Sequence, residues 1–169
     1  MAGAARSAEP GVVTPAAVFD CMVFVQALAN AKGPACACYD LVRSGRLVLH
    51  VSPGVLAEAA DVLSRPKVRR KLPALTDEAV EAFLRDVYGR AMMHSEVPEA
   101  YRLERDPKDE RYLNLAIASE ASYLVSWDRD LLDLMNDEGF RQQFPWLTIL
   151  EPPALLRLFS QAPPGTTPA

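Results

Sequence analysis

Hydrophobic residues along the chain recur with two periods, one typical of buried strands and the other typical of helices. Short apolar runs that predict strands cover residues 16–19, 46–51, 122–126 and 147–150. Hydrophobic residues at helical spacing follow Asp20, and they recur over residues 35–43, 53–65, 77–88, 107–118 and 152–159. Because strands and helices alternate, we expect an α/β fold with a mostly parallel sheet that is covered on both faces.

The chain of 169 residues is long enough for one domain with its own hydrophobic core. Its small, polar and Gly/Pro-containing ends predict disordered tails at residues 1–11 and 161–169, which leaves a folded domain over residues 12–160. No apolar run is long enough to span a bilayer, and the N-terminus lacks the apolar core of a secretory signal. We therefore expect a cytoplasmic protein without a membrane-spanning helix.

Residues 91–105 show no clear period. We expect Met92 and Met93 to lie in the core and Val97 to belong to a short strand. Asp106 and Pro107 end this stretch, because Asp caps the N-terminus of a helix and Pro suits its first position. The helix that follows is apolar on nearly all sides, so we expect it to be well buried.

Four acids lie where this fold would form a ligand crevice. Asp20 and Asp128 each follow a predicted strand, and side chains just past the carboxyl end of a parallel strand point into such a crevice. Glu58 lies in the early turns of a helix that follows another strand, and Asp109 opens a later helix. Two plainer interpretations remain: Asp128 could serve only as a helix N-cap, and Glu58 could lie on a solvated helix face.

If the four carboxylates converge, they would repel each other unless a cation lay among them. Mg²⁺ or Mn²⁺ is the natural occupant, since hard cations bind carboxylate oxygens and complete their coordination with water and substrate phosphate. Such a site activates water for attack on phosphorus and needs no nucleophilic Ser or Cys. Ser126 could orient a carboxylate or the waters of the metal, or it could simply end a strand.

Charge and cysteine content narrow the choice of partner. A net charge of −4 excludes a globally basic nucleic-acid binder. The three cysteines lack further ligands at zinc-site spacing, so we expect reduced, buried thiols. His50 and His94 lie far apart in the sequence and adjoin none of the motifs. One local basic cluster is either a phosphate-contacting patch or a solvated turn beside a short helix, and it consists of Arg65, Lys67, Arg69, Arg70 and Lys71.

In their order along the chain, these motifs resemble those of the PIN-domain nucleases. The resemblance covers roughly residues 13–160 and is strongest for VapC-like toxin components of toxin–antitoxin systems. It rests on Val-Phe-Asp ending at Asp20, Ser52-Pro53 followed by Glu58, Asp-Pro-Lys-Asp ending at Asp109, Leu-Val-Ser-Trp-Asp ending at Asp128, and the closing Ile-Leu-Glu-Pro-Pro.

The resemblance implies a three-layer α/β/α domain that cleaves single-stranded RNA with Mg²⁺ or Mn²⁺, has an antitoxin protein as a partner and forms a homodimer. Trp127 departs from the family pattern, because glycine is common at this position, and its aromatic ring could narrow the site or stack on an RNA base. Residue by residue, the resemblance places the catalytic and metal-binding acids at Asp20, Glu58, Asp109 and Asp128, a peripheral metal-site acid at Asp130 and the family's hydroxyl at Ser126.

Three functions follow as hypotheses. The four acids favour a metal-dependent endoribonuclease. Met22 stands near Asp20, where the family often has a polar residue, and motivates a PIN-fold protein that binds RNA or a partner without cutting. The acids alone would also suit a small-molecule metal phosphohydrolase, although no Asp-x-Asp nucleophile motif follows the first strand.

Overall fold

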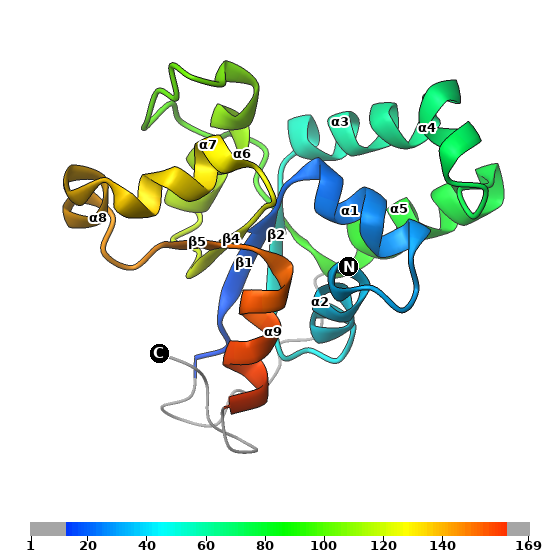
Figure 1. The fold of residues 1–169 in the computed structure, drawn as a ribbon, viewed down its shortest axis with the longest axis horizontal. Helices are drawn as coiled ribbons and strands as arrows, with labels where there is room; N and C mark the ends of the chain where they lie inside the picture. The colour runs from blue at the N-terminus through cyan, green and yellow to red at the C-terminus, as the bar shows by residue number, and fades with distance from the viewer. Residues whose placement is uncertain (1–12, 162–169) are drawn as a thin grey trace.

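Short strands form one parallel sheet at the centre of the molecule (Figure 1). The structure of the protein, a computed structural model, describes residues 13–161. The spatial order of the strands is β3-β2-β1-β4-β5, and every neighbouring pair is parallel. This confirms the predicted α/β fold. The strands are β1 (Ala16–Phe19), β2 (Val48–Val51), β3 (Met92–Met93), β4 (Tyr123–Val125) and β5 (Thr148–Leu150).

Helices cover both faces of this sheet, which gives the three-layer α/β/α arrangement (Figure 1). Helix α6 packs against β1, β2 and β4 on one side, while α1, α2, α5 and α9 pack together on the other. The α-helices are α1 (Cys21–Ala29), α2 (Pro34–Arg43), α3 (Pro53–Ser64), α4 (Pro66–Lys71), α5 (Asp77–Arg90), α6 (Glu110–Ala118), α7 (Arg129–Leu132), α8 (Glu138–Gln143) and α9 (Pro152–Gln161), and the 3₁₀ helices are η1 (Pro107–Asp109) and η2 (Asp133–Asn136).

Side chains cap the N-termini of α1, α3 and α5. Asp20, Ser52 and Thr76 each accept a hydrogen bond from the backbone N–H three residues later. Gly45, with φ of 77°, makes the left-handed turn that leads from α2 into β2. The predicted tail residues 1–11 and 162–169 lie outside the described residues, and α9 extends through Gln161. Within residues 13–161, no helix combines the length and the apolar character that crossing a membrane would require.

The core lies on both sides of the sheet. Aromatic rings fill the layer between the sheet and helices α1, α2 and α5, where Phe19 and Phe24 lie 5.8 Å apart and Tyr39 and Phe83 lie 5.1 Å apart between ring centroids. On the opposite face, α6 buries nearly its whole circumference, as its apolar sequence predicts. This helix therefore holds the segment before it, which begins at Asp106, firmly against the sheet.

The prediction that Met92 and Met93 lie in the core is wrong. These residues form the edge strand β3, and their exposed fractions are 57% and 40%. An edge strand has only one neighbouring strand, here β2, so its side chains remain partly uncovered. Val97 belongs to no strand and packs half-buried against the core.

The order of the strands creates a switch point between β1 and β4. From β1 the chain crosses to β2 on one side, and it later returns to place β4 on the other side. In open parallel sheets, ligands bind outside the carboxyl ends of the strands at such a point. The register pairs Phe19 with Val125, so β1 and β4 end side by side. Asp20 and Ser126 are the next residues of the two strands.

Candidate active site

Asp20 is held at the end of β1 by three interactions. Its backbone N–H donates to the carbonyl of Val125 at 3.2 Å, and its carboxylate accepts the N–H of Val23 at 3.1 Å as the N-cap of α1. Its other carboxylate oxygen accepts a hydrogen bond from the hydroxyl of Ser126. Only 6% of Asp20 is exposed, and this burial raises its pKa above the usual value. The carboxylate of Asp20 therefore caps α1 and lies at the carboxyl end of β1, where the crevice is expected.

Ser126 links the ends of β1 and β4. Its hydroxyl donates to Asp20 and accepts the backbone N–H of Asp128 at 2.9 Å. The side chain is fully buried, so no water can replace either bond. The hydroxyl thus orients a carboxylate, which is the first of the two roles considered from the sequence.

Asp106, Asp109 and Asp128 form a compact group of carboxylates, which we call the acidic cluster. Each offers one oxygen, and these oxygens all lie within 4.8 Å of one another. Oδ2 of Asp109 is buried and has no hydrogen-bond partner. Burial first, then the negative charge of Asp128, raise the pKa of Asp109 to about 8. Close carboxylate oxygens with an unpartnered buried acceptor match the donor set that a hard divalent cation requires.

The remaining predicted acids surround this cluster. The charge of Asp20 contributes to the raised pKa of Asp109, so the two carboxylates are near neighbours. Asp130 donates its backbone N–H to Asp128 at 2.8 Å, while its own carboxylate pairs with Arg105 at 3.2 Å. Glu58 lies outside the group of oxygens within 4.8 Å. The structure thus places Asp109 and Asp128 together, Asp20 beside them, and Asp130 and Glu58 at the periphery.

Glu58 is held by residues of α6. It accepts the hydroxyl of Tyr112, which burial keeps neutral by raising its pKa, and it lies 3.6 Å from the guanidinium of Arg111. The thiol of Cys21 lies near the same acids, because the negative charges of Glu58, Asp20 and Asp109 all raise its pKa. Burial is the main reason that the pKa of Cys21 rises to about 11. Cys21 therefore stays protonated and unreactive at neutral pH.

The cysteines agree only in part with the expectation of buried thiols. None of the three forms a disulfide within residues 13–161. Cys36 and Cys38 are buried, whereas Cys21 is half-buried beside the acids. Burial raises the pKa of Cys38 to about 12, so this thiol is also inert.

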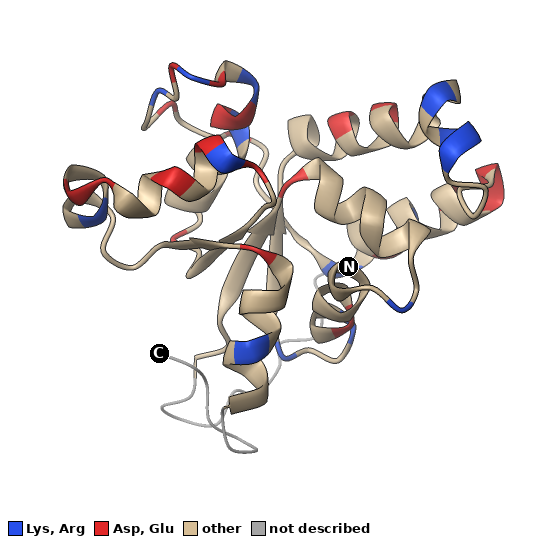
Figure 2. Cartoon of the chain, viewed as in Figure 1, with Lys and Arg blue, Asp and Glu red and all other residues tan. Residues whose placement is uncertain are grey.

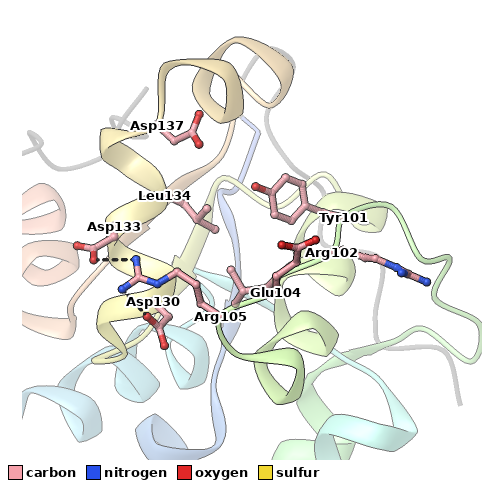
Figure 3. A pocket seen from close by; sticks show the side chains of 9 residues that line it. Tyr101, Arg102, Glu104, Arg105, Asp130, Asp133, Leu134 and Asp137 are labelled. Atoms are coloured by element: carbon pink, nitrogen blue, oxygen red, sulfur yellow. Dashed lines mark ion pairs between the residues drawn. The ribbon is translucent and has the colours of Figure 1, made fainter.

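A pocket of about 320 Å³ lies beside Asp130, two residues after Asp128 of the acidic cluster, and Figure 3 shows side chains that line it. Arg105 crosses it and pairs with Asp130 at 3.2 Å and with Asp133 at 3.6 Å. Because Asp130 also donates to Asp128, the pocket and the cluster share one loop. The lining residues are Tyr101, Arg102, Leu103, Glu104, Arg105, Asp130, Asp133, Leu134 and Asp137.

The predicted basic cluster lies on the short helix α4, at the far end of α3 from the crevice (Figure 2). The 12 residues of α3 separate the two places by about 18 Å, at about 1.5 Å per residue. Arg65 pairs with Asp61 and Arg69 pairs with Asp77, each at 2.6 Å. Lys67, Arg70 and Lys71 are exposed and have no ion pair within residues 13–161.

Trp127 lies between Ser126 and Asp128 and is partly buried against the core. Its indole N–H is buried and has no hydrogen-bond partner. A buried indole usually finds an acceptor, so this donor is a point at which a bound polar group would be stabilised.

Asp106 was missed by the sequence prediction as a candidate ligand. Its role as a helix cap was recognised, and its carboxylate does accept the N–H of Lys108 at 3.1 Å. Capping uses one oxygen, which leaves the other available to the acidic cluster. The signal was present in the sequence, because Asp106 and Asp109 are three residues apart and so lie on one side of a helical turn.

Replacing Ser126 with Ala tests the link between the two strand ends. We expect the free energy of unfolding to fall by about 1–3 kcal/mol, because Asp20 and the N–H of Asp128 lose their buried partner. Affinity for Mn²⁺ should fall by about 10–100-fold, as happens when a residue that orients a ligand is removed. Chemical denaturation and calorimetric titration measure the two effects. Ser119→Ala removes only a local hydrogen bond to the carbonyl of Ala116 and is the matched control. It should change neither the free energy of unfolding nor the Mn²⁺ affinity greatly.

Comparison with known proteins adds two findings. An uncharacterized protein of Methanocaldococcus jannaschii is 25% identical to this chain over 123 residues, which cover 73% of the chain and 77% of the relative. The model of the PIN domain family matches residues 16–130, from β1 through the loop that carries Asp128 and Asp130. Because this match spans more than half of the chain, the protein belongs to the PIN domain family.

Proposed function

We propose that the protein is a metal-dependent endoribonuclease that cleaves single-stranded RNA. The observation that carries the proposal is the acidic cluster at the carboxyl end of the sheet, in which an oxygen of Asp109 is buried without a partner. Membership of a family whose fold is nuclease-like supports the same reaction class. The nearby thiol of Cys21 would not compete as a nucleophile, since it stays protonated.

The residues would act in defined roles. Asp109 and Asp128 would hold Mg²⁺ or Mn²⁺, with Asp106 and Asp20 completing the negative shell and Glu58 and Asp130 at its rim. A bound divalent cation would activate water and stabilise charge on the phosphate. Ser126 would hold the carboxylate of Asp20 in place, and the hydroxyl of Tyr112 would do the same for Glu58. These hydrogen bonds preorganise the acids before a metal arrives.

RNA is the proposed substrate because of the groups that flank the crevice. The indole of Trp127 lies next to Asp128, and the exposed part of its ring could stack on an unstacked base. The exposed cations of α4 would attract the phosphate backbone at a distance from the reacting bond. Bases of a single strand can reach an aromatic ring, whereas those of a duplex are stacked inside the helix.

Incubation of the purified chain with labelled single-stranded RNA tests the proposal. We expect cleavage with Mn²⁺ or Mg²⁺ and none after chelation. Parallel reactions with duplex RNA, single-stranded DNA and a chromogenic phosphate ester define the substrate class. If the protein binds RNA but cuts it under none of these conditions, the nuclease proposal is wrong and the protein is an RNA-binding protein.

Neutralising the exposed cations of α4 tests whether they bind RNA. The triple replacement of Lys67, Arg70 and Lys71 by Gln should weaken RNA binding, because fewer phosphates are neutralised and fewer condensed counterions are released. The slope of log affinity against log salt should become shallower by about 0.7 for each phosphate of a single strand that is no longer neutralised. Titrations at several salt concentrations measure this slope. The matched control replaces three exposed cations elsewhere, Lys32, Arg141 and Arg157, and should leave the slope nearly unchanged.

We further propose that the protein is the toxin of a toxin–antitoxin pair, is restrained by an antitoxin protein and forms a homodimer. The resemblance of its motifs to VapC-like toxins supports this assignment. Induced expression of the wild type should arrest growth, and Asp128→Asn should not. Light scattering of the purified chain measures its oligomeric state. Normal growth during wild-type expression, despite RNA cleavage in vitro, would argue against the toxin role.

A further inference from the structure

His50 and His94 meet at the edge of the sheet, although they are 44 positions apart in the sequence. His50 lies on β2, and His94 follows β3. Nδ1 of His50 and Nε2 of His94 are 2.7 Å apart, and the ring centroids are 4.8 Å apart. The facing nitrogens of the two rings are thus within hydrogen-bond distance of each other, and the tautomers decide which ring donates.

The strand pairing holds the rings in this position. The backbone N–H of His94 donates to the carbonyl of Val51 at 2.8 Å, which continues the parallel ladder one residue past β3. His50 pairs with Met92, and residues two apart on a strand lie on the same face. His50, Met92 and His94 consequently share one face of the sheet, and the convergence follows from the backbone register.

Both imidazoles are suited to bind a metal ion. Burial, followed by the charge of His94, lowers the pKa of His50 to about 4, so its ring is neutral at pH 7 as a ligand must be. The second nitrogens of the rings, Nε2 of His50 and Nδ1 of His94, have no hydrogen-bond partner within residues 13–161. Met92 is 57% exposed beside the pair, so the site is open to solvent and a thioether lies nearby.

We propose that His50 and His94 form a second metal site, which chelates an imidazole-preferring transition ion such as Zn²⁺ or Cu²⁺. Imidazole nitrogen favours these ions, whereas the carboxylates of the acidic cluster favour Mg²⁺ and Mn²⁺. Nδ1 of His50 and Nε2 of His94 are 2.7 Å apart. If they move slightly farther apart, both nitrogens can coordinate one ion instead of sharing a hydrogen bond. Water or Met92 would complete the coordination.

The site would brace the part of the chain that leads to the acidic cluster. His94 begins the segment 94–106, which passes from the edge strand to Asp106 without a helix or strand. An ion bound by both histidines would fasten the start of this segment to β2. We expect Zn²⁺ to raise the thermal unfolding midpoint through this crosslink, in the presence of saturating Mg²⁺.

Calorimetric titration of untagged protein with Zn²⁺, in saturating Mg²⁺, tests the proposal. The wild type and Asp109→Asn should bind Zn²⁺ with the same affinity. Mg²⁺ occupies the acidic cluster of the wild type, and the substitution weakens metal binding by that cluster in the variant. His50→Gln and His94→Gln should each weaken Zn²⁺ binding by about tenfold or more, since each removes one of two protein ligands. Equal affinity in the wild type and both histidine variants would overturn the proposal.

Electron paramagnetic resonance of the Cu²⁺-loaded wild type gives a second readout that needs no variant to fold. We expect the copper to couple to two imidazole nitrogens. A spectrum that shows coupling to fewer than two would contradict chelation by both histidines, and the two rings would then share only a hydrogen bond. RNA cleavage in Mg²⁺ does not depend on this site. Failure of the histidine site and failure of the nuclease can therefore be told apart.

Discussion

Replacement of Asp128 with Asn is expected to reduce Mn²⁺-dependent RNA cleavage by about 100-fold or more, while the chain remains folded. Asn is as good an N-cap as Asp, so the bond from the N–H of Asp130 to the side chain survives. The substitution removes one negative charge of the acidic cluster. Removal of one preorganised electrostatic group from an active site commonly has an effect of this size.

Rates of cleavage at saturating RNA, measured across a range of Mn²⁺ concentrations, check this expectation. Asp40→Asn is the matched control, because Asp40 is an exposed acid that pairs with Arg43 on α2. Its rate should equal that of the wild type. An Asp128→Asn variant that cuts RNA as fast as the wild type would remove Asp128 from the site. Recovery of the rate at high Mn²⁺ would instead indicate that the missing charge acts mainly through metal affinity.

Without metal, ionisation of Asp109 is expected to lower the free energy of unfolding as the pH rises from about 4 to about 8. The pKa of Asp109 is raised from 3.8 to about 8 in the folded chain, so the folded state binds a proton that the unfolded state releases. Raising the pH removes this proton and leaves a buried charge beside Asp128. Asp109→Asn mimics the protonated side chain, so this variant should be the more stable protein near pH 8 and should have a flatter pH profile.

Mn²⁺ should reverse this trend in the wild type, because the metal binds the ionised carboxylates. At a metal concentration about 100 times the Kd, binding stabilises the folded state by about 2.7 kcal/mol. For a chain of this size, that raises the unfolding midpoint by about 5–10 °C. Thermal unfolding of both proteins with Mn²⁺ or with a chelator, at pH values across this range, measures the effects. If Mn²⁺ shifts Asp109→Asn as much as the wild type, Asp109 is not a ligand.

Hydrophobic periodicity and capping residues were sufficient to predict the alternating architecture and the positions of Asp20 and Asp128. Asp20 is the first residue after β1 and Asp128 the third after β4, and parallel strands end at one edge of a sheet, so their proximity follows from local patterns. Ser126 could be predicted as a neighbour of the site for the same reason. The link that it makes between Asp20 and Asp128 depends on its side-chain orientation, which periodicity does not determine.

Other features depend on tertiary contacts that leave little trace in the sequence. The edge strand β3 has only two residues, Met92 and Met93, and such a short apolar pair is typical of a core as well. The meeting of His50 with His94 requires knowledge that β2 and β3 are paired and in which register. The hydrogen bond from Tyr112 to Glu58 could not be predicted from the sequence. Tyr112 lies on an apolar helix, and its aromatic ring alone is enough to explain its burial.

The hydrogen bond between Ser126 and Asp20 joins positions 106 residues apart. During synthesis the chain emerges from its N-terminus, so β1 and Asp20 appear long before β4 and Asp128. A nascent chain that ends before this point carries the first acid but cannot assemble the acidic cluster, and pairing over such long separations is slow. The metal binding that we propose for this cluster would therefore be a property of the finished fold, acquired only when the centre of the sheet closes.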